Sequence, residues 1–487
     1  MSTTTEDSGT QQGVRIGDRR KWWALAVVAV AQLMTVLDLA VVYVALPSMQ
    51  RSLGISLADR QWVVSAYAIS FGGLLLLGGR LVDRLGRKRT FVWALLAFGA
   101  ASALGGAATS GGMLFAARAL QGSMAAVVAP AVLSLVTVTF TERAERATAF
   151  AVFGMVSGSG AAIGLIAGGV LTQYGSWRWC LFINVPLAVI VAAAGAVALR
   201  GDEPAPRRGY DLAGSVTVTL GLACLAEGFT RAEPDGWGSS ATLVPLALGA
   251  ALIAAFVAIE LRSDAPLLPL RIVTEYHRAL LYLAALLANA AQLSLFLFLT
   301  YYFQTTRQYS ALHTGFAFLP FALAVILTAN VSASRVVRAA PITLMLTGAV
   351  LSTGALLAFS TLSAADSYPT RVMLPEVLMG MGVALSLFPL NNVVLAGIDP
   401  ADAGVASAAI ATTQQMGGSL GNSLLNSVYG IAVAGYVAVG LQRGDSTGAA
   451  MRGYDVVFRA EAALYAVCLV LFALVAMHLR KKAAAVG

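Results

Sequence analysis

Apolar runs of about twenty residues alternate with short polar segments along almost the whole chain. Each run is long enough for an α-helix to cross the hydrocarbon core of a membrane, which takes about 20 residues. Backbone groups in lipid must bond to one another, so helices are the expected form. The pattern predicts fourteen transmembrane helices, at 22–47, 60–79, 90–109, 112–138, 146–171, 178–199, 211–230, 241–260, 279–303, 313–333, 341–361, 371–395, 404–436 and 459–479.

Two polar segments that contain proline divide these helices into groups. The segments "RGDEPAPRRGYD" and "ELRSDAPLLPLRIVTEYH" flank the seventh and eighth apolar runs. We therefore predict an all-α membrane protein with a six-helix bundle at 22–200, two inserted helices at 201–270 and a second six-helix bundle at 271–480. Residues 1–21 and 481–487 are expected to be cytoplasmic tails, and the polar composition of the first predicts disorder.

The composition supports lipid as the main solvent of the protein. Hydrophobic residues make up 58% of the chain and charged residues only 11%, and the mean hydropathy is +0.78. The net charge of +8 is spread thinly between apolar runs, which excludes a nucleic-acid-binding domain. Three cysteines far apart in the sequence predict neither a disulfide framework nor a metal site, and no cofactor is expected.

The distribution of positive charge predicts the orientation. If the N-terminus lies in the cytoplasm and the helices alternate in direction, most of the Lys and Arg residues fall on the cytoplasmic side. Both termini are therefore expected in the cytoplasm. The chain is rich in Ala, Gly and Arg, which indicates a GC-rich bacterial genome, so the expected location is the bacterial cytoplasmic (inner) membrane.

Four motifs occupy particular places among the predicted helices. They are "LDLAVVYVALP" in the first helix, "GGRLVDRLGRKRTF" after the second, "RALQGSMAA" in the fourth and "WRWCLFINVPLAV" at the start of the sixth. Together they resemble the motifs of the major facilitator superfamily, in particular its branch of fourteen-span drug:proton antiporters. The resemblance implies proton-coupled export of hydrophobic small molecules, such as antibiotics, by alternating access between two bundles.

The resemblance also implies a cytoplasmic gate in the loop after the second helix. The family pattern falls there on Gly79, Asp83, Arg84, Gly86 and Arg87. Glycine permits close packing and a tight turn. Asp83 could pair with an arginine or a helix N-terminus in one conformation and release it in the other.

Three positions depart from the antiporter branch. Ala40 and Tyr43 stand where threonine and asparagine are expected, and Leu165 stands where proline is expected in the fifth helix. The change at Leu165 leaves open a proton-coupled symporter or importer of the same fold. A non-transporting membrane sensor is a second alternative, although nothing in the sequence resembles a soluble signalling domain. An enzyme is not expected, because the sequence offers no nucleophile–base set.

Asp38 and Arg118 are the ionisable residues expected deep within the first and fourth helices. An ionisable residue near the bilayer centre costs about 2.5–3.5 kcal/mol on insertion scales, so few are expected without a reason. Arg118 cannot lose its proton. We therefore expect Asp38 to carry the coupling proton, while Arg118 sets its affinity by approaching or leaving. The alternative is a static buried pair.

A set of polar side chains is predicted to line a substrate cavity. In the first and fourth helices the set comprises Gln32, Thr35, Tyr43 and Gln121, with Asp38 on the same side as the first three. In the ninth and thirteenth helices it comprises Asn289, Gln292, Gln415, Ser419, Asn422 and Asn426. The residues of the thirteenth helix recur every three or four positions, so they face either a cavity or a neighbouring helix to which they hydrogen-bond.

Small residues in the fifth helix predict a close helix contact. Gly160, Gly164 and Gly168 recur at intervals of four, the spacing that lets two membrane helices approach closely. We expect this contact to slide during alternating access.

The expected partners follow from these features. They are a hydrophobic small-molecule substrate, protons and membrane lipid, with no nucleic acid, and the chain is expected to act as a monomer. The few carboxylates in the predicted helices suit neutral, singly charged or zwitterionic amphiphiles better than multivalent cations.

Overall fold

A computed structural model describes residues 8–140, 142–199, 211–263, 268, 270–332, 341–396, 398, 403–438 and 446–486. Every regular element within these ranges is a helix. This outcome agrees with the long apolar runs, because a helix satisfies its own backbone hydrogen bonds in lipid.

The first helices form what we call the N-terminal bundle. It consists of α1 (Ser8–Leu53), α2 (Trp62–Leu85), α3 (Arg87–Gly106), α4 (Gly111–Thr139), α5 (Arg143–Tyr174), the short α6 (Trp179–Phe182) and α7 (Asn184–Ala198). α1 packs against α5, α2 against α4, and α3 against both α4 and α7.

The last helices form what we call the C-terminal bundle. It consists of α10 (Leu270–Thr274), α11 (Tyr276–Tyr301), the π-helical turn η1 (Tyr302–Thr306), α12 (Ala311–Ala317), α13 (Leu319–Ser332), α15 (Pro341–Ser360), the π-helical turn η2 (Tyr368–Met373), α16 (Leu374–Leu395), α17 (Ala403–Ala438) and α18 (Ser446–Val486). α11 packs against α17 and α18, and α15 packs against α16 and α18.

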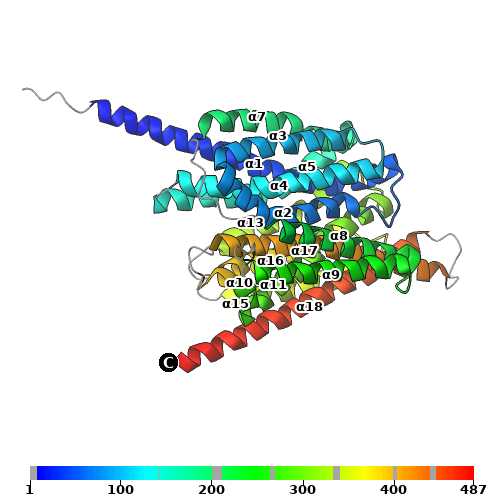
Figure 1. The fold of residues 1–487 in the computed structure, drawn as a ribbon. Helices are drawn as coiled ribbons and strands as arrows, with labels where there is room; N and C mark the ends of the chain where they lie inside the picture. The colour runs from blue at the N-terminus through cyan, green and yellow to red at the C-terminus, as the bar shows by residue number, and fades with distance from the viewer. Residues whose placement is uncertain are drawn as a thin grey trace, which may run out of the picture.

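Two further helices, α8 (Leu212–Asp235) and α9 (Ser240–Arg262), lie between the bundles in the sequence. α8 packs against α2 of one bundle and α17 of the other, and α9 packs against α8. Apolar side chains of all four helices fill this contact, among them Ile69, Val218, Phe256 and Leu420. The hairpin therefore lies over the seam between the bundles (Figure 1).

The helices run roughly along one axis, with the N-terminal bundle above the C-terminal bundle in the view of Figure 1. α1 and the last turns of α18 extend from the same end of the molecule, on the left of the figure. We call this the terminal end and the opposite side the distal end. The distal end carries the connection between α1 and α2.

α1 begins within the predicted N-terminal tail. It starts at Ser8, so the expectation of disorder is wrong for residues 8–21. Arg20 Nε donates to the Ala198 carbonyl at 3.2 Å, and Lys21 Nζ pairs with Glu145 at 3.1 Å. These contacts tie the segment to α7 and α5, which polarity along the sequence could not reveal.

α18 likewise begins earlier than the apolar run from 459 predicted. It starts at Ser446, and Asp455 pairs within the helix with Arg452 at 2.7 Å and Arg459 at 2.6 Å. Ion pairs three or four residues apart stabilise a helix where hydropathy is low.

Twelve helices in the described ranges are long and apolar enough to cross a membrane. A helix occupies each of the fourteen predicted ranges, but α5 and α17 are not among the twelve. The amides and hydroxyls of α17 lower its hydropathy, and several side chains of α5 lie outside the described residues. Fourteen spans are therefore not confirmed by length and hydropathy.

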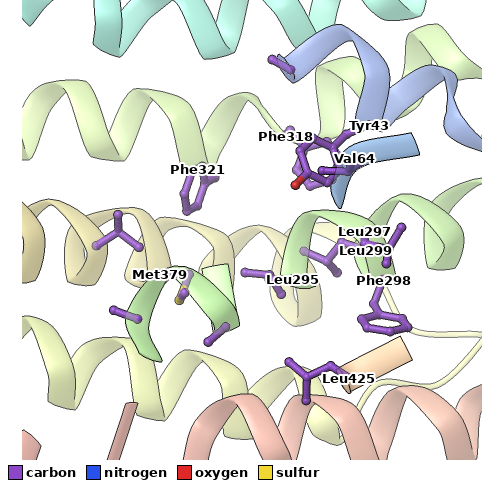
Figure 2. Packing of buried hydrophobic residues seen from close by; sticks show 14 of the residues in the cluster. Tyr43, Val64, Leu295, Leu297, Phe298, Leu299, Phe318, Phe321, Met379 and Leu425 are labelled. Carbon is purple, nitrogen blue, oxygen red and sulfur yellow. The ribbon is translucent and has the colours of Figure 1, made fainter. Parts of the chain in front are cut away.

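Apolar packing differs between the two halves of α1. Residues 24–34 belong to a buried cluster with α3, α4 and α7 of their own bundle. Residues 37–49 belong to another buried cluster that includes Leu295 and Phe298 of α11. Figure 2 shows part of this second cluster, with Tyr43 and Val64 from the N-terminal bundle and Leu295 and Phe318 from the C-terminal bundle. The shared apolar core thus lies toward the distal end.

The glycines of α5 make the predicted close contact, and α1 is its partner. A Cβ added at Gly160 would lie 3.0 Å from the Val36 side chain, and one at Gly164 would lie 2.7 Å from the Ala40 Cβ. A Cβ at Gly168 would lie 2.9 Å from the backbone oxygen of Val41. The two backbones therefore approach more closely than larger side chains would allow.

Candidate functional site

A buried ion pair joins α1 and α4. Arg118 Nη1 lies 2.6 Å from Asp38 Oδ2, and both side chains are fully buried. The guanidinium also donates to Gln121 Oε1 and to the Val63 carbonyl, each at 3.0 Å, and lies 4.5 Å from the centroid of the Tyr67 ring. Burying two charges costs several kcal/mol per ion unless such contacts compensate it. The structure brings together the pair that the sequence singled out.

Two amides complete the surroundings of the carboxylate. Asn184 Nδ2 of α7 donates to Asp38 Oδ1 at 2.7 Å, and Gln121 Nε2 donates to the same oxygen at 3.0 Å. Ser102 Oγ of α3 lies 3.2 Å from Asn184 Nδ2 and 2.5 Å from Gln121 Nε2. We call this set the Asp38 node, made of Asp38, Ser102, Arg118, Gln121 and Asn184. It joins α1, α3, α4 and α7.

Sequence reasoning missed two members of the Asp38 node. Ser102 gave no signal, because one serine in an apolar helix satisfies itself by bonding to its own backbone. Asn184 did give a signal, since it belongs to "WRWCLFINVPLAV", which contributed to the resemblance without receiving a role. An amide buried in an apolar helix needs a partner, and here the partner is Asp38.

Asp38 and Tyr43 do not line one wall, contrary to the prediction. Asp38 points into its own bundle, whereas the Tyr43 ring crosses to α11 and lies 5.8 Å from the ring of Phe296. Phe296 in turn lies 5.4 Å from Phe318 and 5.1 Å from Phe321. An aromatic surface between the bundles therefore begins at Tyr43.

The polar stripe of α17 divides into two parts. Asn426 has a full set of partners across the bundles: it accepts from Arg60 at 2.9 Å and donates to Gln61 Oε1 and the Leu57 carbonyl, both at 3.0 Å. Asn422 is also fully buried, yet both atoms of its amide lack a hydrogen-bond partner in the described part of the chain, as does the Tyr43 hydroxyl that faces it. Asn426 therefore hydrogen-bonds to neighbouring helices, which was one of the two predicted roles of the α17 residues. Asn422 instead keeps a buried amide without a hydrogen-bond partner in the described part of the chain.

The remaining predicted cavity residues are scattered. Thr35 Oγ1 donates to the Gln32 carbonyl at 2.8 Å and Asn289 Nδ2 to the Ala285 carbonyl at 3.1 Å, each within its own helix. Gln292 is half-buried on α11.

Gln415 and Ser419 of α17 lie against α2. A Cβ added at Gly72 of α2 would lie 3.1 Å from the Gln415 Cβ, and Ser65 Oγ donates to the Ser419 carbonyl at 3.3 Å. Both residues thus lie at the contact between the two bundles.

The gate motif occupies the connection between α2 and α3 at the terminal end. Gly86 has φ +85°, a conformation that favours glycine, so the predicted tight turn is present. Close packing falls on Gly78 and not on Gly79: a Cβ at Gly78 would lie 2.1 Å from the Ala126 carbonyl oxygen, whereas one at Gly79 would come no nearer than 3.9 Å to Pro130. Glycine content alone could not distinguish these neighbours.

Of the charged residues of the gate motif, Arg87 contacts α4, whereas Asp83 and Arg84 face outward. Arg87 Nε donates to Ser134 Oγ of α4 at 2.6 Å. Asp83 and Arg84 are exposed, and Asp83 makes no hydrogen bond or ion pair with the described part of the chain. Among the described residues, no arginine or helix N-terminus therefore pairs with Asp83 in this conformation.

A second buried arginine, which the sequence reasoning missed, lies at the distal end. Arg60 is 2% exposed and its guanidinium lies 4.0 Å from the ring centroid of Tyr301 and 5.2 Å from that of Tyr429. Its Nε donates to Asn426 at 2.9 Å. Arg60 precedes an apolar run, so its position in the sequence suggested an ordinary loop charge; only the approach of α11 and α17 buries it.

Other bonds between the bundles also lie toward the distal end. Gln304 Nε2 of η1 donates to the Val44 carbonyl at 2.8 Å, and the Tyr301 hydroxyl donates to Gln50. Gly315 of α12 packs so tightly on α5 that an added Cβ would lie 2.5 Å from the Leu165 carbonyl oxygen. Leu165, which stands where proline was expected, is thus part of this contact.

Comparison with known proteins gives the chain a family context. The sequence model of the Major Facilitator Superfamily matches residues 28–422. The chain is 44% identical over 443 residues to the puromycin resistance protein pur8 of Streptomyces alboniger, covering 90% of this chain and 87% of the relative. It is 38% identical over 416 residues to the cephamycin export protein CmcT of Amycolatopsis lactamdurans, covering 85% and 86% respectively.

A solved structure has the same fold. The POT family transporter PepTSo superposes with a TM-score of 0.69 at 16% identity, covering 95% of this chain and 99% of that one. At this level of identity the likeness concerns the fold alone.

Proposed function

The chain belongs to the major facilitator superfamily, and from that premise we propose that it exports hydrophobic, antibiotic-like small molecules across the bacterial cytoplasmic membrane in exchange for protons. The names of its relatives, for puromycin resistance and cephamycin export, support a small-molecule cargo. The observation that carries the proton coupling is the fully buried pair of Asp38 and Arg118.

The Asp38 node supplies a physical route from protonation to movement. When Asp38 binds a proton from outside, its attraction to Arg118 is lost and the arginine is left with only neutral partners. Because the carboxylate also receives hydrogen bonds from α4 and α7, neutralising it weakens contacts among several helices together. Release of the proton to the cytoplasm restores the pair, while substrate moves outward.

We further propose fourteen membrane spans, made of the twelve strongly apolar helices together with α5 and α17. α5 packs against α1, and α17 packs against α2 and α11, so both lie within the body of the protein. The bundles at 22–200 and 271–480 would be the two rocking domains, with both termini in the cytoplasm and the protein acting as a monomer. The terminal end is then cytoplasmic and the distal end external.

The conformation that best fits these contacts is inward-facing. The bonds of Arg60, Gln304 and Tyr301 between the bundles lie toward the distal end. At the terminal end, the buried apolar residues from Ala24 to Met34 of α1 belong to the apolar cluster of their own bundle, and Asp83 is exposed. An external closure with a loosened cytoplasmic side is the arrangement expected before substrate enters from the cytoplasm.

The surface that starts at Tyr43 is the proposed substrate contact. Phe296, Phe318 and Phe321 supply aromatic faces there, and Asn422 supplies an unused amide. Such a surface suits an apolar molecule with a few hydrogen-bonding groups. Gln32, Thr35, Asn289, Gln292, Gln415, Ser419 and Asn426 are retained as predicted cavity residues, most of which could reach substrate only after the bundles move.

Transport by the purified protein in liposomes tests the proposal, with puromycin as the probe. An imposed pH gradient should drive puromycin against its concentration gradient. Asp38→Asn should reduce both this transport and the puromycin-dependent proton flux at least about tenfold. A tenfold change corresponds to about 1.4 kcal/mol of coupling free energy. Asp235→Asn, at an exposed position on α8, is the matched control and should behave like wild type. Undiminished proton flux in the Asp38 variant would remove Asp38 from the mechanism.

The same liposomes separate export from import. In an exporter, protons and puromycin move in opposite directions, so a gradient that is acidic on the side facing the distal end should drive puromycin toward that side. Movement of both in one direction would favour the symporter that Leu165 left open.

A further inference from the structure

We propose that Glu461 is a second proton-binding site, located in the C-terminal bundle at the place that the Asp38 node occupies in the N-terminal bundle. The protonation of Glu461 is inferred from the structure directly. Its exchange during transport rests on the proposed proton-driven export.

Helix order relates the two places. In the N-terminal bundle the Asp38 node uses the first, third, fourth and sixth helices, namely α1, α3, α4 and α7. In the C-terminal bundle the helices of the same order are α11, α15, α16 and α18, and each contributes a fully buried polar residue to one region. These residues are Ser294, Ser352, Ser386 and Glu461.

These four side chains lie near one another. Ser294 of α11 faces the Glu461 carboxyl. Tyr465, one turn further along α18, faces both Glu461 and Ser352 of α15. Ser386 of α16 lies beside α15, since its Oγ is 2.5 Å from a Cβ added at Gly348. Gly348 is one turn before Ser352, so Ser386 belongs to the same region. We call this group, with Tyr465, the Glu461 node.

The Glu461 node differs from the Asp38 node in having unused polar atoms. Both carboxyl oxygens of Glu461 are buried and lack a hydrogen-bond partner within the described residues. The same holds there for the hydroxyls of Ser294, Ser352, Ser386 and Tyr465. By contrast, Asp38 has an arginine and two amides around it.

No cation in the described residues faces Glu461 from the helices around it. On α18, the side chains of Arg452 and Arg459 are 51% and 62% exposed and pair with Asp455. α11 carries Arg278, which pairs with Glu275 near the terminal end. Within their described residues, α15 and α17 contain no Lys or Arg.

The titratable groups near Glu461 are also unable to balance a negative charge. On α18 they are Tyr465 and Cys468, both buried and neither a cation. The other deeply buried acid of this bundle is Glu376, whose Oε2 lies 3.4 Å from the Tyr368 hydroxyl. A carboxylate left in such surroundings without a cation would cost several kcal/mol.

The carboxyl of Glu461 is therefore neutral and holds a proton in this conformation. Asp38, by contrast, lies 2.6 Å from the guanidinium of Arg118 in the same conformation. Because one acid has a cation beside it and the other has none, we expect them to exchange protons at different steps of the cycle. Glu461 thus gives the C-terminal bundle a proton-binding site in addition to Asp38 of the N-terminal bundle.

Infrared spectroscopy of the purified protein in lipid nanodiscs tests the protonation without any substrate. At neutral pH the carbonyl stretch of a protonated carboxylic acid should weaken in Glu461→Gln relative to wild type and remain unchanged in Asp38→Asn. Glu227→Gln is the matched control, because Glu227 is paired with Arg231 at the surface of α8. An unchanged carbonyl band in Glu461→Gln would overturn the proposal.

Folding does not limit this test. Glutamine has the shape of a protonated glutamate, so Glu461→Gln should unfold at the same temperature as wild type. Glu461→Lys, which places a charge at the same position, should instead lower that temperature. A marked loss of stability in Glu461→Gln with none in Glu461→Lys would contradict a neutral carboxyl.

Proton counting with puromycin in liposomes tests the exchange. If Glu461 carries one of two protons, Glu461→Gln should lower the number of protons moved per puromycin by about half, while puromycin exchange without a pH gradient continues. An unchanged ratio would show that the Glu461 proton is static and overturn the coupling. If wild type moves no puromycin, the export proposal fails, and the infrared result still decides whether Glu461 is protonated.

Discussion

At the scale of single residues, Arg118 and Arg60 carry the same charge but have different hydrogen-bond partners and therefore different roles. Arg118 uses its planar fork on three acceptors from α1, α2 and α4 and presents its face to Tyr67. Arg60 is buried as deeply but has aromatic rings and an amide where Arg118 has a carboxylate. The first arginine therefore holds a charge in place within one bundle, and the second joins two bundles.

Arg118→Lys tests whether charge or geometry matters at the Asp38 node. Lysine keeps the positive charge but has three donors on one point and cannot reach the Val63 carbonyl, Gln121 and Asp38 together. We expect puromycin transport against its gradient to fall at least about tenfold, which corresponds to about 1.4 kcal/mol.

Arg51→Lys is the control for Arg118→Lys. Arg51 is exposed at the distal end and donates to the Pro47 carbonyl of its own helix, so its replacement should leave transport unchanged. Wild-type transport by Arg118→Lys would mean that a positive charge alone suffices.

At the scale of helices, small residues set how closely neighbours can approach. In the contact of α5 with α1, a backbone carbonyl oxygen lies only 2.9 Å from a Cβ added at Gly168. The same holds for α2 with α4, where Gly78 and Gly122 face backbone atoms at 2.1 and 2.2 Å from an added Cβ. The contact with α5 fixes the position of α1, and with it the position of Asp38.

Gly168→Ala should therefore destabilise the protein although alanine is the better helix former. The added methyl would meet the Val41 backbone at 2.9 Å, and overpacking of this kind costs about 1–3 kcal/mol. We expect a lower thermal unfolding midpoint and a loss of transport. Gly354→Ala makes the same exchange in α15, where nothing lies within 4 Å of the added Cβ.

The expected result for Gly354→Ala is an equal or higher midpoint, since alanine in a helix is favoured over glycine by about 1 kcal/mol. If both variants shift the midpoint alike, helix propensity and not the approach of α1 would explain the glycines.

At the scale of the whole molecule, the two bundles meet mainly toward one end. Arg60 connects the start of α2 with α11 and α17, and Gln61 Nε2 donates to Thr230 Oγ1 of α8 at 2.7 Å. The inserted hairpin of α8 and α9 therefore lies beside the same contact between the two bundles. A change at this seam should shift the balance between conformations without touching the Asp38 node.

Arg60→Ala should open the distal end. It removes a hydrogen bond to Asn426 and three contacts with aromatic rings, and a cation–π contact that excludes water is worth about 2 kcal/mol. Spin labels at the exposed positions Thr109 and Thr361, in a variant without the native cysteines, report the distance between the bundles there. We expect a population with a longer distance than in wild type.

Arg231→Ala is the matched control, because this exposed arginine of α8 pairs only within its own helix in the described contacts, with Glu227 at 2.7 Å. A distance distribution for Arg60→Ala that matches wild type and the control would show that Arg60 does not hold the bundles together.

The sequence by itself determined the helical class and the places of the helices, and it singled out Asp38 and Arg118 as ionisable residues within two of them. Hydropathy over about twenty residues is a local property that lipid imposes on each span separately, and a buried carboxylate stays charged only beside a cation. Helix ends were less predictable, because α1 and α18 are extended by ion pairs and by contacts with distant residues.

Only the tertiary structure decided which polar residues meet. Asn184 and Ser102 belong to the Asp38 node because α3 and α7 converge on α1. Glu461 stands close to Arg459 in the sequence, yet Arg459 turns outward and Glu461 inward, since two positions along a helix point to different sides. The environment of a side chain depends on the neighbours that other helices bring to it, and the sequence pattern of one helix cannot contain that information.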